Sequence, residues 1–554
     1  MLSNAVIAHH IKPRPIGQVA DQLGIDKSDL LPYGREMAKV HVNALQRPGR
    51  RQGNLVLVSA TTPTAAGEGK TTTTIGLGQA FAKLGESVCL ALREPSLGPC
   101  LGMKGGATGG GYSQIVPSDR INMHFTGDFH AMTSANNLLS AVIDNHIYHG
   151  NELNIDPRRI LWRRVMDMND RSLRHIVLGL GGKMQGIPRE GGFDITAASE
   201  VMAMLCLASD LDDFSHRLEN TLVAFTYSGE PVFAKQLQVT GAMLALLREA
   251  IHPNLVQSLE GVPTFVHGGP FANIAHGCNS LIATRMAQHY ADWAITEAGF
   301  GFDLGAEKFF DIKCRIGNLD PVAVVLVTTT RALKLHGGKS PDTLGGKDLR
   351  ALRKGLDNLD KHIENVRKFN KQAVVSLNLF SGDDSEELEL IQKHCQKLNT
   401  PFALCDHFAN GGEGAIELAK QVLQVANQSQ PFRPLYSLDL AVEEKIRIVS
   451  REIYGADDVA FTKQAAKDLL QIQQLGFENL PVCIAKAPGS LSDDPKLLGR
   501  PRHFDITVRS IQINSGAGFL VVLTGEILRM PGLPKHPSAE RWQLQQDGSI
   551  HGLE

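Results

Sequence analysis

A short glycine–lysine segment carries the residue types that bind phosphate groups. Gly67, Gly69, Lys70 and Thr71 lie within the stretch Gly67-Glu68-Gly69-Lys70-Thr71. Glycines let backbone N–H groups converge on phosphate oxygens, because no Cβ stands in the way. A lysine at this place supplies positive charge to the outer phosphates, and a threonine hydroxyl can ligate Mg²⁺. The pattern predicts a nucleotide-binding loop.

The flanking elements favour the same interpretation. The apolar run Leu55–Val58 predicts a buried strand and Thr71–Leu84 predicts a helix, so the loop joins a strand to a helix N-terminus. One departure is that Thr64 stands where the usual motif has its first glycine. The alternative is a glycine-rich turn that only connects strand and helix. The residues predicted to bind the nucleotide are Thr64, Ala65, Ala66, Gly67, Glu68, Gly69, Lys70 and Thr71.

Charged residues follow the next predicted strand, Ser87–Leu92, which ends at Arg93 and Glu94. Side chains at the carboxyl end of a strand, beside a phosphate-binding loop, lie where open α/β sheets bind ligands. The alternative for Arg93 is a surface ion pair with Glu94. Residues 98–112 then contain seven glycines, including Gly105 and Gly106. So many glycines exclude a regular helix or strand core and predict a loop that approaches another group closely.

Two histidines and an aspartate stand close together at His124, Asp128 and His130. They could form a metal site, but no third histidine follows at helical spacing, and a hydrogen-bonded polar cluster is the better interpretation. Asp128 could still bind a hard cation or orient an amine. Glu297 and Asp303 follow another predicted strand and are candidates for second-sphere magnesium binding or for capping the next helix.

Two aromatic residues follow predicted strands further along the chain. Phe380 comes after Ala373–Asn378, and Phe408 comes after Phe402–Cys405. Phenylalanines are most often core residues. At the end of a strand, however, each ring is placed as a stacking platform for a flat ligand would be.

Bulk properties limit the classes of function. With 554 residues the chain exceeds what one hydrophobic core usually supports, so two or three domains are expected. A formal net charge of −2 gives no support to a broad basic surface, which argues against nucleic acid as a main partner. No apolar run approaches the roughly 18 residues of a membrane span. Eight scattered cysteines and the absence of a secretory signal at Met1–His10 predict a cytoplasmic protein with reduced thiols.

Strand and helix patterns alternate along most of the chain, which predicts an α/β fold. We expect a mostly parallel sheet of the P-loop NTPase type, flanked by helices, with additional smaller α/β domains. The alternation over residues 150–260 also predicts a largely parallel sheet with covering helices. The expected domains are 1–340, with an inserted segment at about 130–300, then 341–435 and 436–554.

Several long motifs resemble those of formate–tetrahydrofolate ligase, also called 10-formyltetrahydrofolate synthetase, in its monofunctional form. The similarity spans nearly the whole chain in collinear order. The motifs that carry it are residues 67–71, 93–99, 104–112, 124–130, 267–277, 297–308, 328–338 and 530–534.

This resemblance implies ligation of formate to N10 of tetrahydrofolate through formyl phosphate, with ATP and Mg²⁺ and a possible monovalent cation (K⁺ or NH₄⁺). It implies catalytic roles for Lys70, Arg93, Glu94 and Asp128, and a cleft lined by Gly105 and Gly106. Phe380 and Phe408 would sandwich the pterin, although the second aromatic residue is more often tryptophan. Thr71, Glu94 and Asp128 would be the metal ligands. The resemblance also implies a homotetramer that acts in one-carbon metabolism.

Two other classes are compatible with a phosphate-binding loop. A nucleotide switch needs compact loops that reorder around the γ-phosphate and a surface for a protein partner. Another carboxylate–amine ligase would keep Lys70 and Arg93 but would not need Phe380 and Phe408. The glycine-rich loop, the polar strand ends and the aromatic pair favour a ligase with a flat second substrate.

Overall fold

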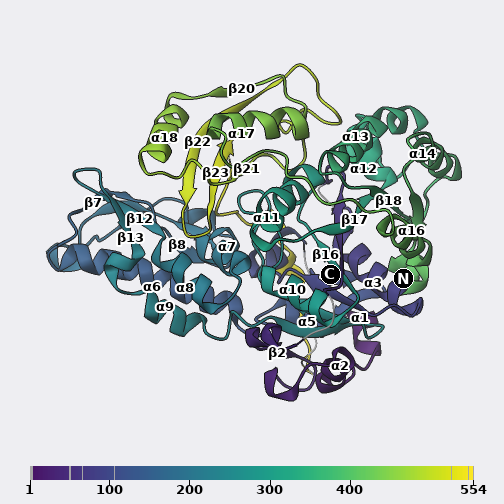
Figure 1. Cartoon of the computed structure of the whole chain (residues 1–554), viewed down its shortest axis with the longest axis horizontal. Coiled ribbons are helices and arrows are strands. Elements are labelled where there is room, and N and C mark those ends of the chain that lie inside the picture. The colour runs from purple at the N-terminus through teal and green to yellow at the C-terminus, as the bar shows by residue number, and fades with distance from the viewer. Residues whose placement is uncertain are drawn as a thin grey trace.

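The fold is built on one twelve-stranded sheet. The structure is a computed structural model that describes residues 4–48, 52–64, 67–104, 107–525, 527–546, 548 and 550–552. Ten strands follow the order β1-β2-β14-β15-β4-β16-β3-β17-β18-β19, and β5 and β6 join through β14. Helices cover both faces of this sheet (Figure 1). The α/β prediction is confirmed.

The centre of the sheet is parallel. Neighbouring strands run in the same direction from β15 to β19. Their bounds are β15 Pro263–Val266, β4 Val88–Leu92, β16 Trp293–Glu297, β3 Asn54–Ala60, β17 Pro321–Thr328, β18 Ala373–Asn378 and β19 Phe402–Cys405. The strands β3, β4, β16, β18 and β19 were expected from the sequence. Parallel strands are usually buried on both faces and therefore read as nearly continuous hydrophobic segments.

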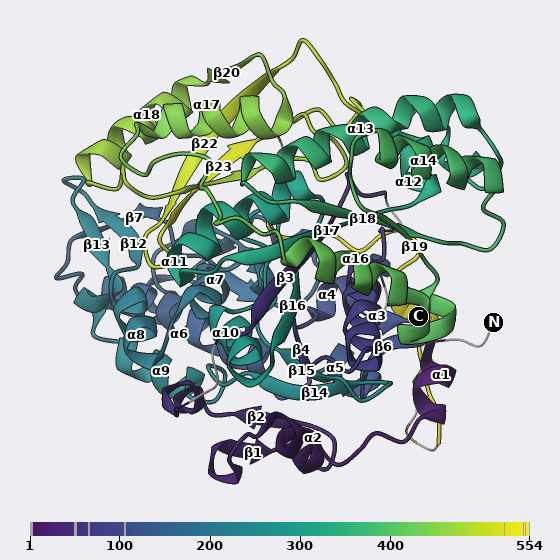
Figure 2. The same cartoon turned by 45° about the vertical axis from the view of Figure 1, so that its right-hand side comes forward.

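Alternate residues of β3 show how both faces are buried. Leu55 and Leu57 belong to one hydrophobic core, and Val56 and Val58 belong to the other. On the second side lie α3 (Lys70–Lys83) and α16 (Ile416–Ala426), which run close together in Figure 2. On the first side lie α10 (Leu281–Tyr290) and α13 (Leu349–Lys368). No helix in the described ranges is long and apolar enough to cross a membrane.

One edge of the sheet is antiparallel. β14 (Asn254–Ser258) pairs with β15, with β2 (Ala38–Val40) and with β6 (Ser113–Val116). β1 (Leu30–Pro32) then pairs with β2, and β5 (Gly109–Gly110) pairs with β6. The N-terminal arm therefore extends the sheet.

The prediction of a largely parallel sheet over residues 150–260 is wrong. β12 (Leu222–Thr226) pairs antiparallel with both β13 (Pro231–Phe233) and β7 (Ile155–Ile160). The connection from β12 to β13 is a short turn, in which Gly229 has a φ of +95°. Parallel strands need a crossover of a dozen or more residues, so this turn permits only an antiparallel pair. β9 (Ile176–Leu178) and β10 (Arg189–Gly191) form a second antiparallel pair.

Helices surround these small sheets. Their bounds are α6 Asp128–Tyr148, α7 Glu200–Leu207, α8 Leu211–Glu219 and α9 Thr240–Leu247. β8 (Arg164–Met166) and β11 (Phe193–Ile195) form a further short pair, which is parallel.

The C-terminal part forms its own four-stranded sheet, at the top of Figure 1. Its strand order is β20-β22-β23-β21. The elements are α17 Val442–Val449, β20 Asp458–Phe461, α18 Lys463–Gln474, β21 Val482–Ala485, β22 Asp505–Asn514 and β23 Phe519–Thr524. β18 and β19, by contrast, belong to the central sheet although they lie in the predicted second unit. The boundaries near residues 340 and 435 stay a prediction.

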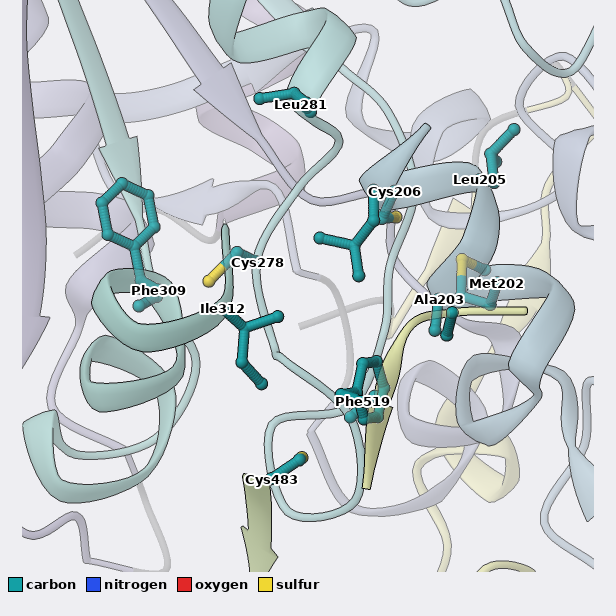
Figure 3. Close-up of a cluster of buried hydrophobic side chains, with 14 of the residues drawn as sticks. Met202, Ala203, Leu205, Cys206, Cys278, Leu281, Phe309, Ile312, Cys483 and Phe519 are labelled. Carbon is teal, nitrogen blue, oxygen red and sulfur yellow. The ribbon is translucent and has the colours of Figure 1, made fainter. Parts of the chain in front are cut away.

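Apolar side chains bind the C-terminal sheet to the rest of the chain. Cys483 on β21 and Phe519 on β23 are fully buried and lie near Met202 of α7 and Ile312 of helical segment η9 (Phe309–Cys314) (Figure 3). All eight cysteines are buried and free, as expected for reduced thiols.

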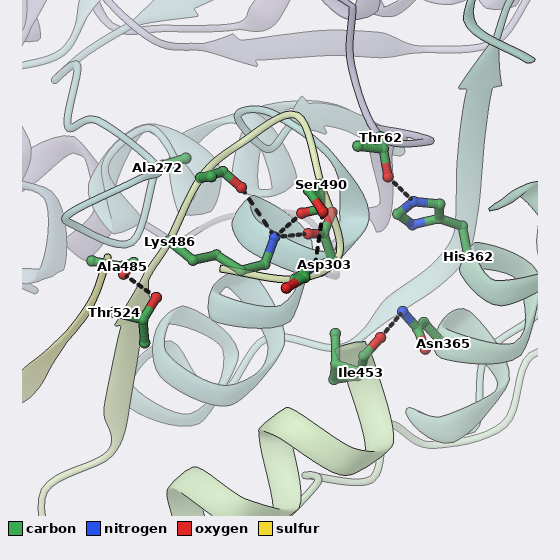
Figure 4. Close-up of polar contacts among 12 residues, drawn as sticks. Thr62, Ala272, Asp303, His362, Asn365, Ile453, Ala485, Lys486, Ser490 and Thr524 are labelled. Atoms are coloured by element: carbon green, nitrogen blue, oxygen red, sulfur yellow. Dashed lines mark hydrogen bonds and ion pairs between the residues drawn. The ribbon is translucent and has the colours of Figure 1, made fainter. Parts of the chain in front are cut away.

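A buried ion pair joins the same two parts. Lys486 Nζ lies 2.7 Å from Asp303 Oδ2, and neither side chain is exposed (Figure 4). Asp303 lies in helical segment η8 (Phe302–Ala306), which follows β16 of the central sheet, and Lys486 follows β21. The Asp303 carboxylate thus forms an ion pair with the ammonium of Lys486 and does not cap a helix.

Lys486→Met is expected to destabilise the protein by about 3–5 kcal/mol, because the Asp303 carboxylate would stay buried without its partner. Thermal unfolding and denaturant midpoints would measure the loss. Lys368→Met, which removes the partner of the half-exposed Glu452, is the matched control and should cost less than about 1 kcal/mol. If Lys486→Met costs no more than this control, the ion pair does not hold the C-terminal sheet in place.

Candidate active site

The carboxyl ends of the central parallel strands bring the predicted residues to one edge of the sheet. β3 leads into the glycine–lysine loop, and β4 ends just before Arg93. β16 ends at Glu297, and β18 ends at Asn378. Because these strands are parallel neighbours, residues far apart in the sequence meet here.

The glycine–lysine loop has the backbone that its glycines predict. Gly67 and Gly69 have φ values of +77° and +76°, in the left-handed region that favours glycine. A Cβ on Gly69 would lie 3.1 Å from Asn378 Nδ2. α3 begins at Lys70, so Lys70 and Thr71 occupy the first turn of this helix. Ala65 and Ala66 lie outside the described residues.

Glu68 has a structural task within the loop. Its side chain is buried, and Oε1 accepts a hydrogen bond of 2.8 Å from the Thr64 backbone N–H. Oε2 accepts one of 2.7 Å from the Thr329 hydroxyl, at the start of α12 (Thr330–His336). The carboxylate thereby fixes the shape of the loop and ties it to the end of β17.

Glu297 joins the loop to Arg93. Its Oε2 accepts a hydrogen bond of 2.7 Å from the Thr71 hydroxyl. Its Oε1 accepts hydrogen bonds from Arg93 Nε at 3.3 Å and Arg93 Nη2 at 3.2 Å. The Glu297 side chain is only 3% exposed, whereas that of Arg93 is 25% exposed. Arg93 therefore pairs with Glu297, and the alternative pair with Glu94 is not found.

Asp128 lies in a buried ion pair that the sequence did not predict. Lys39 Nζ lies 2.7 Å from Asp128 Oδ1 and 2.9 Å from Oδ2. Asn254 Nδ2 donates a further hydrogen bond of 2.8 Å to Oδ2. Lys39 also donates to the carbonyl oxygen of His252 at 2.9 Å. Both carboxylate oxygens of Asp128 are therefore occupied by donors from the chain.

Glu94 lies close enough to Asp128 for the two charges to interact. Burial raises the pKa of Glu94 well above its usual range, and the negative charge of Asp128 adds to this effect. Glu94 Oε2 has no hydrogen-bond partner among the described residues. Glu94 therefore favours its neutral form.

The two histidines of this region pair with each other. His124 Nδ1 lies 2.7 Å from His130 Nε2. In the described part of the chain, no group of three or more His, Cys, Asp or Glu residues could hold a metal ion. The contact between the two rings agrees with the prediction of a hydrogen-bonded polar cluster.

The glycine-rich segment packs against the loop that carries Phe408. Tyr112 N donates a hydrogen bond of 2.9 Å to the Phe408 carbonyl oxygen. A Cβ on Gly111 would lie 1.9 Å from that oxygen, and one on Gly110 would lie 2.9 Å from the Phe408 ring. The close approach that the glycines predict is found here, to another part of the same chain. Gly105 and Gly106 lie outside the described residues.

Both predicted aromatic platforms are partly exposed. Phe380 is 41% exposed and Phe408 is 40% exposed. The Arg331 guanidinium lies over the Phe380 ring, 4.5 Å from its centre, and Gly110 and Gly111 contact the Phe408 ring. Each ring is therefore supported by the protein yet keeps exposed surface that a flat ligand could cover.

A buried hydrogen-bond network, missed by the sequence reasoning, joins these aromatic loops to α3. Asn378 Nδ2 donates to Thr73 Oγ1 at 2.9 Å and to the Glu68 carbonyl oxygen at 3.0 Å. His407 Nε2 lies 3.2 Å from Thr73 Oγ1. Burial lowers the pKa of His407 to about 4, so its ring is neutral near pH 7. The sequence signal that could have revealed this network is the polar residue at or just after the end of β18 and of β19, next to each aromatic loop.

The sequence model of the formate–tetrahydrofolate ligases matches residues 2–554, which is the whole chain apart from Met1. The chain belongs to the formate–tetrahydrofolate ligase family. The resemblance seen in the sequence motifs is thus confirmed. Members are ATP-dependent carbon–nitrogen ligases, with ATP and tetrahydrofolate as substrates.

Glu94→Gln is expected to raise the melting temperature relative to wild type, by an amount that grows as pH rises above about 5. Folding raises the pKa of Glu94, so the contribution of this residue to the free energy of unfolding is fully present at pH values below its unfolded-state pKa. That contribution is lost as pH rises through the folded-state pKa. Glutamine cannot ionise and avoids the loss.

Thermal unfolding at several pH values above about 5 would measure the difference in melting temperature between wild type and Glu94→Gln. Glu389→Gln, at a half-exposed i,i+4 pair with Lys393, is the control and should show little pH-dependent difference. A Glu94→Gln difference that does not change with pH would contradict a buried, neutral Glu94.

Proposed function

We propose that this ligase works in two steps. A formate oxygen attacks the γ-phosphorus of ATP, the bond to the bridging oxygen breaks, and ADP leaves. N10 of tetrahydrofolate then attacks the carbonyl carbon of formyl phosphate. Phosphate leaves, the nitrogen loses its proton, and 10-formyltetrahydrofolate results. Phosphorylation is needed because formate itself has no good leaving group.

The observation that carries this proposal is the carboxylate of Glu297 between Thr71 and Arg93. It places a partly exposed guanidinium beside the first turn of the helix that follows the glycine–lysine loop. Phosphoryl transfer depends on charge neutralisation and alignment. Lys70 would contact the outer phosphates, and the planar fork of Arg93 would hold formyl phosphate in a geometry that lysine cannot match.

The residues at Thr71 fit Mg²⁺. Magnesium in such sites takes one or two protein oxygens together with phosphate oxygens and water. Thr71 would supply its hydroxyl oxygen, and Glu297, whose oxygens accept hydrogen bonds from Thr71 and Arg93, supplies negative charge beside it. When bound, Mg²⁺ neutralises charge on the phosphates. The Thr71 hydroxyl donates its hydrogen bond to Glu297, so a lone pair of its oxygen stays available for Mg²⁺.

A monovalent cation at Glu94 and Asp128 fits less well. Both oxygens of Asp128 already accept hydrogen bonds from Lys39, which supplies a fixed positive charge. Only Glu94 Oε2 remains as an acceptor without a partner among the described residues of this pair. We therefore assign no step to such a cation, and propose that Glu94 helps to position the attacking amine while the Lys39–Asp128 pair holds the local structure.

We further propose that Phe380 and Phe408 hold the pterin ring of tetrahydrofolate. Support comes from their exposed rings and from the network through Asn378, Thr73 and His407, which fixes both loops relative to α3. Family resemblance supports three further proposals: a homotetramer, a cytoplasmic location and a role in one-carbon metabolism.

The first experiment measures ADP release by the purified protein with Mg-ATP, adding formate and tetrahydrofolate separately and together. We expect turnover to require both, and the folate product to give the methenyl chromophore in acid. Lys70→Ala should abolish formate-dependent ADP release, because the charge at the outer phosphates is lost. Steady hydrolysis that is indifferent to both substrates would contradict the proposal and favour a nucleotide switch.

Phe408→Ala should raise the KM for tetrahydrofolate and leave the KM for ATP unchanged. The expected loss of binding free energy is roughly 1–3 kcal/mol, as is typical of ring stacking on nucleobases. Steady-state kinetics with each substrate varied in turn would separate the two effects. Phe461→Ala, in the C-terminal sheet on β20, is the control and should change neither KM. An equal increase for ATP would mean that Phe408 has only a structural role.

A further inference from the structure

A cavity lies away from the candidate active site. Its volume is about 520 Å³, within the range of small-molecule sites. One wall comes from residues 158–165, in and after β7, and the other from α18 and β22 of the C-terminal sheet. Figures 1 and 2 both show β7 and β12 below α18 and β22. None of the residues predicted to bind substrate lines this cavity.

Positive charge exceeds negative charge around the cavity. The lining contains the four arginines Arg158, Arg159, Arg163 and Arg529 and the three acids Asp194, Glu200 and Asp468. One of these acids, Asp194, is shared by Arg163 at 3.4 Å and Arg529 at 2.8 Å. Arg158 pairs with Asp156 at 2.8 Å.

The other two acids are already engaged with neutral donors. Glu200 accepts hydrogen bonds from the backbone N–H groups of Gly516 and Ala517, and burial raises its pKa to about 7. Asp468 accepts hydrogen bonds from the Ile511 backbone N–H and from Gln464. Among the described residues neither acid forms an ion pair with an arginine of the lining, although the charge of Arg529 partly offsets the rise in the pKa of Glu200 that burial causes.

Arg159 is the arginine of this lining that is best placed to bind an anion. Its guanidinium lies over the Phe225 ring, 4.6 Å from the ring centre, which restricts the plane of the group. Within the described ranges no carboxylate lies at ion-pair distance from it. Asp156, which is hydrogen-bonded to Arg158, is near enough for the charge of Arg159 to help lower its pKa. A guanidinium that is oriented by stacking and keeps its N–H groups available binds phosphate or carboxylate oxygens at little entropic cost.

The opposite wall offers neutral hydrogen-bonding groups. Gln464, Gln471, Ser510, Gln512 and Asn514 all line the cavity from the C-terminal sheet. Amide and hydroxyl groups of this kind can both donate and accept hydrogen bonds. They suit the hydroxyl or amide groups of a ligand whose charged end lies at Arg159.

We propose that this cavity binds a small organic oxyanion, with a phosphate or carboxylate at Arg159 and a hydroxyl-bearing body against the glutamines. Such a ligand would contact residues 158–165 and the C-terminal sheet at once. It would therefore stabilise the docking of that sheet, which makes the cavity an effector site distinct from the substrate site.

Calorimetry on the full-length protein tests the proposal, with two probes that share a polyol body. Ribitol 5-phosphate carries a phosphate group and ribonate carries a carboxylate on a similar open-chain polyol, so the tighter binder identifies the charged group. Saturating Mg-ADP is present throughout, so that the phosphate loop is filled. We expect binding of at least one probe, and weakening as salt rises.

Arg159→Gln should weaken that binding about tenfold or more, as expected for a lost hydrogen bond between charged groups. Arg248→Gln, an arginine that is 76% exposed and does not line the cavity, is the matched control and should leave binding unchanged. Gln471→Ala tests the opposite wall and should also weaken binding. Unchanged melting temperatures would confirm that the variants are folded.

The proposal is overturned if neither probe binds, or if Arg159→Gln binds as tightly as wild type. It is also overturned if Gln471→Ala keeps full affinity, because the ligand would then not span the two walls. These outcomes are independent of turnover, so they do not depend on the proposed reaction mechanism.

Discussion

The buried carboxylate of Glu297 is the interaction on which the site depends. In the sheet order β4-β16-β3, its strand lies between the strand that leads to Arg93 and the one that leads to Thr71. A glutamate at the end of the middle strand can therefore reach both neighbours. A carboxylate with this little exposure needs strong donors, and the Thr71 hydroxyl and the Arg93 guanidinium supply them. The topology of three parallel strands thus explains why these residues meet.

The same edge of the sheet extends to the aromatic loops. β18 and β19 follow β17 in parallel, so their ends lie next to the glycine–lysine loop. Thr73 is the shared partner of Asn378 and His407, and Asn378 also holds the backbone of Glu68. The proposed phosphate site and the proposed pterin site are consequently parts of one rigid arrangement, which a transfer between two bound substrates requires.

The sequence predicted what local patterns determine. Apolar runs predicted most strands of the parallel centre, and the glycines predicted the loop between β3 and α3, in which Gly67 and Gly69 adopt a left-handed backbone. It could not predict contacts between distant residues. Thr71 and Glu297 are 226 residues apart, and Lys39 and Asp128 are 89 apart. The antiparallel sheet of β7, β12 and β13 was missed because alternation of helices and strands does not fix strand direction when the connecting turn is short.

The most direct test of this account measures kcat for formate-dependent ADP formation by Glu297→Gln. Glutamine keeps the size of the side chain but loses the charge that holds Arg93 beside Thr71. We expect kcat to fall about a hundredfold or more, as when other charge-stabilising groups are removed. Glu364→Gln, at the more exposed pair with Arg500, is the control and should keep wild-type turnover. A folded Glu297→Gln enzyme with a kcat close to wild type would contradict the central role of this carboxylate.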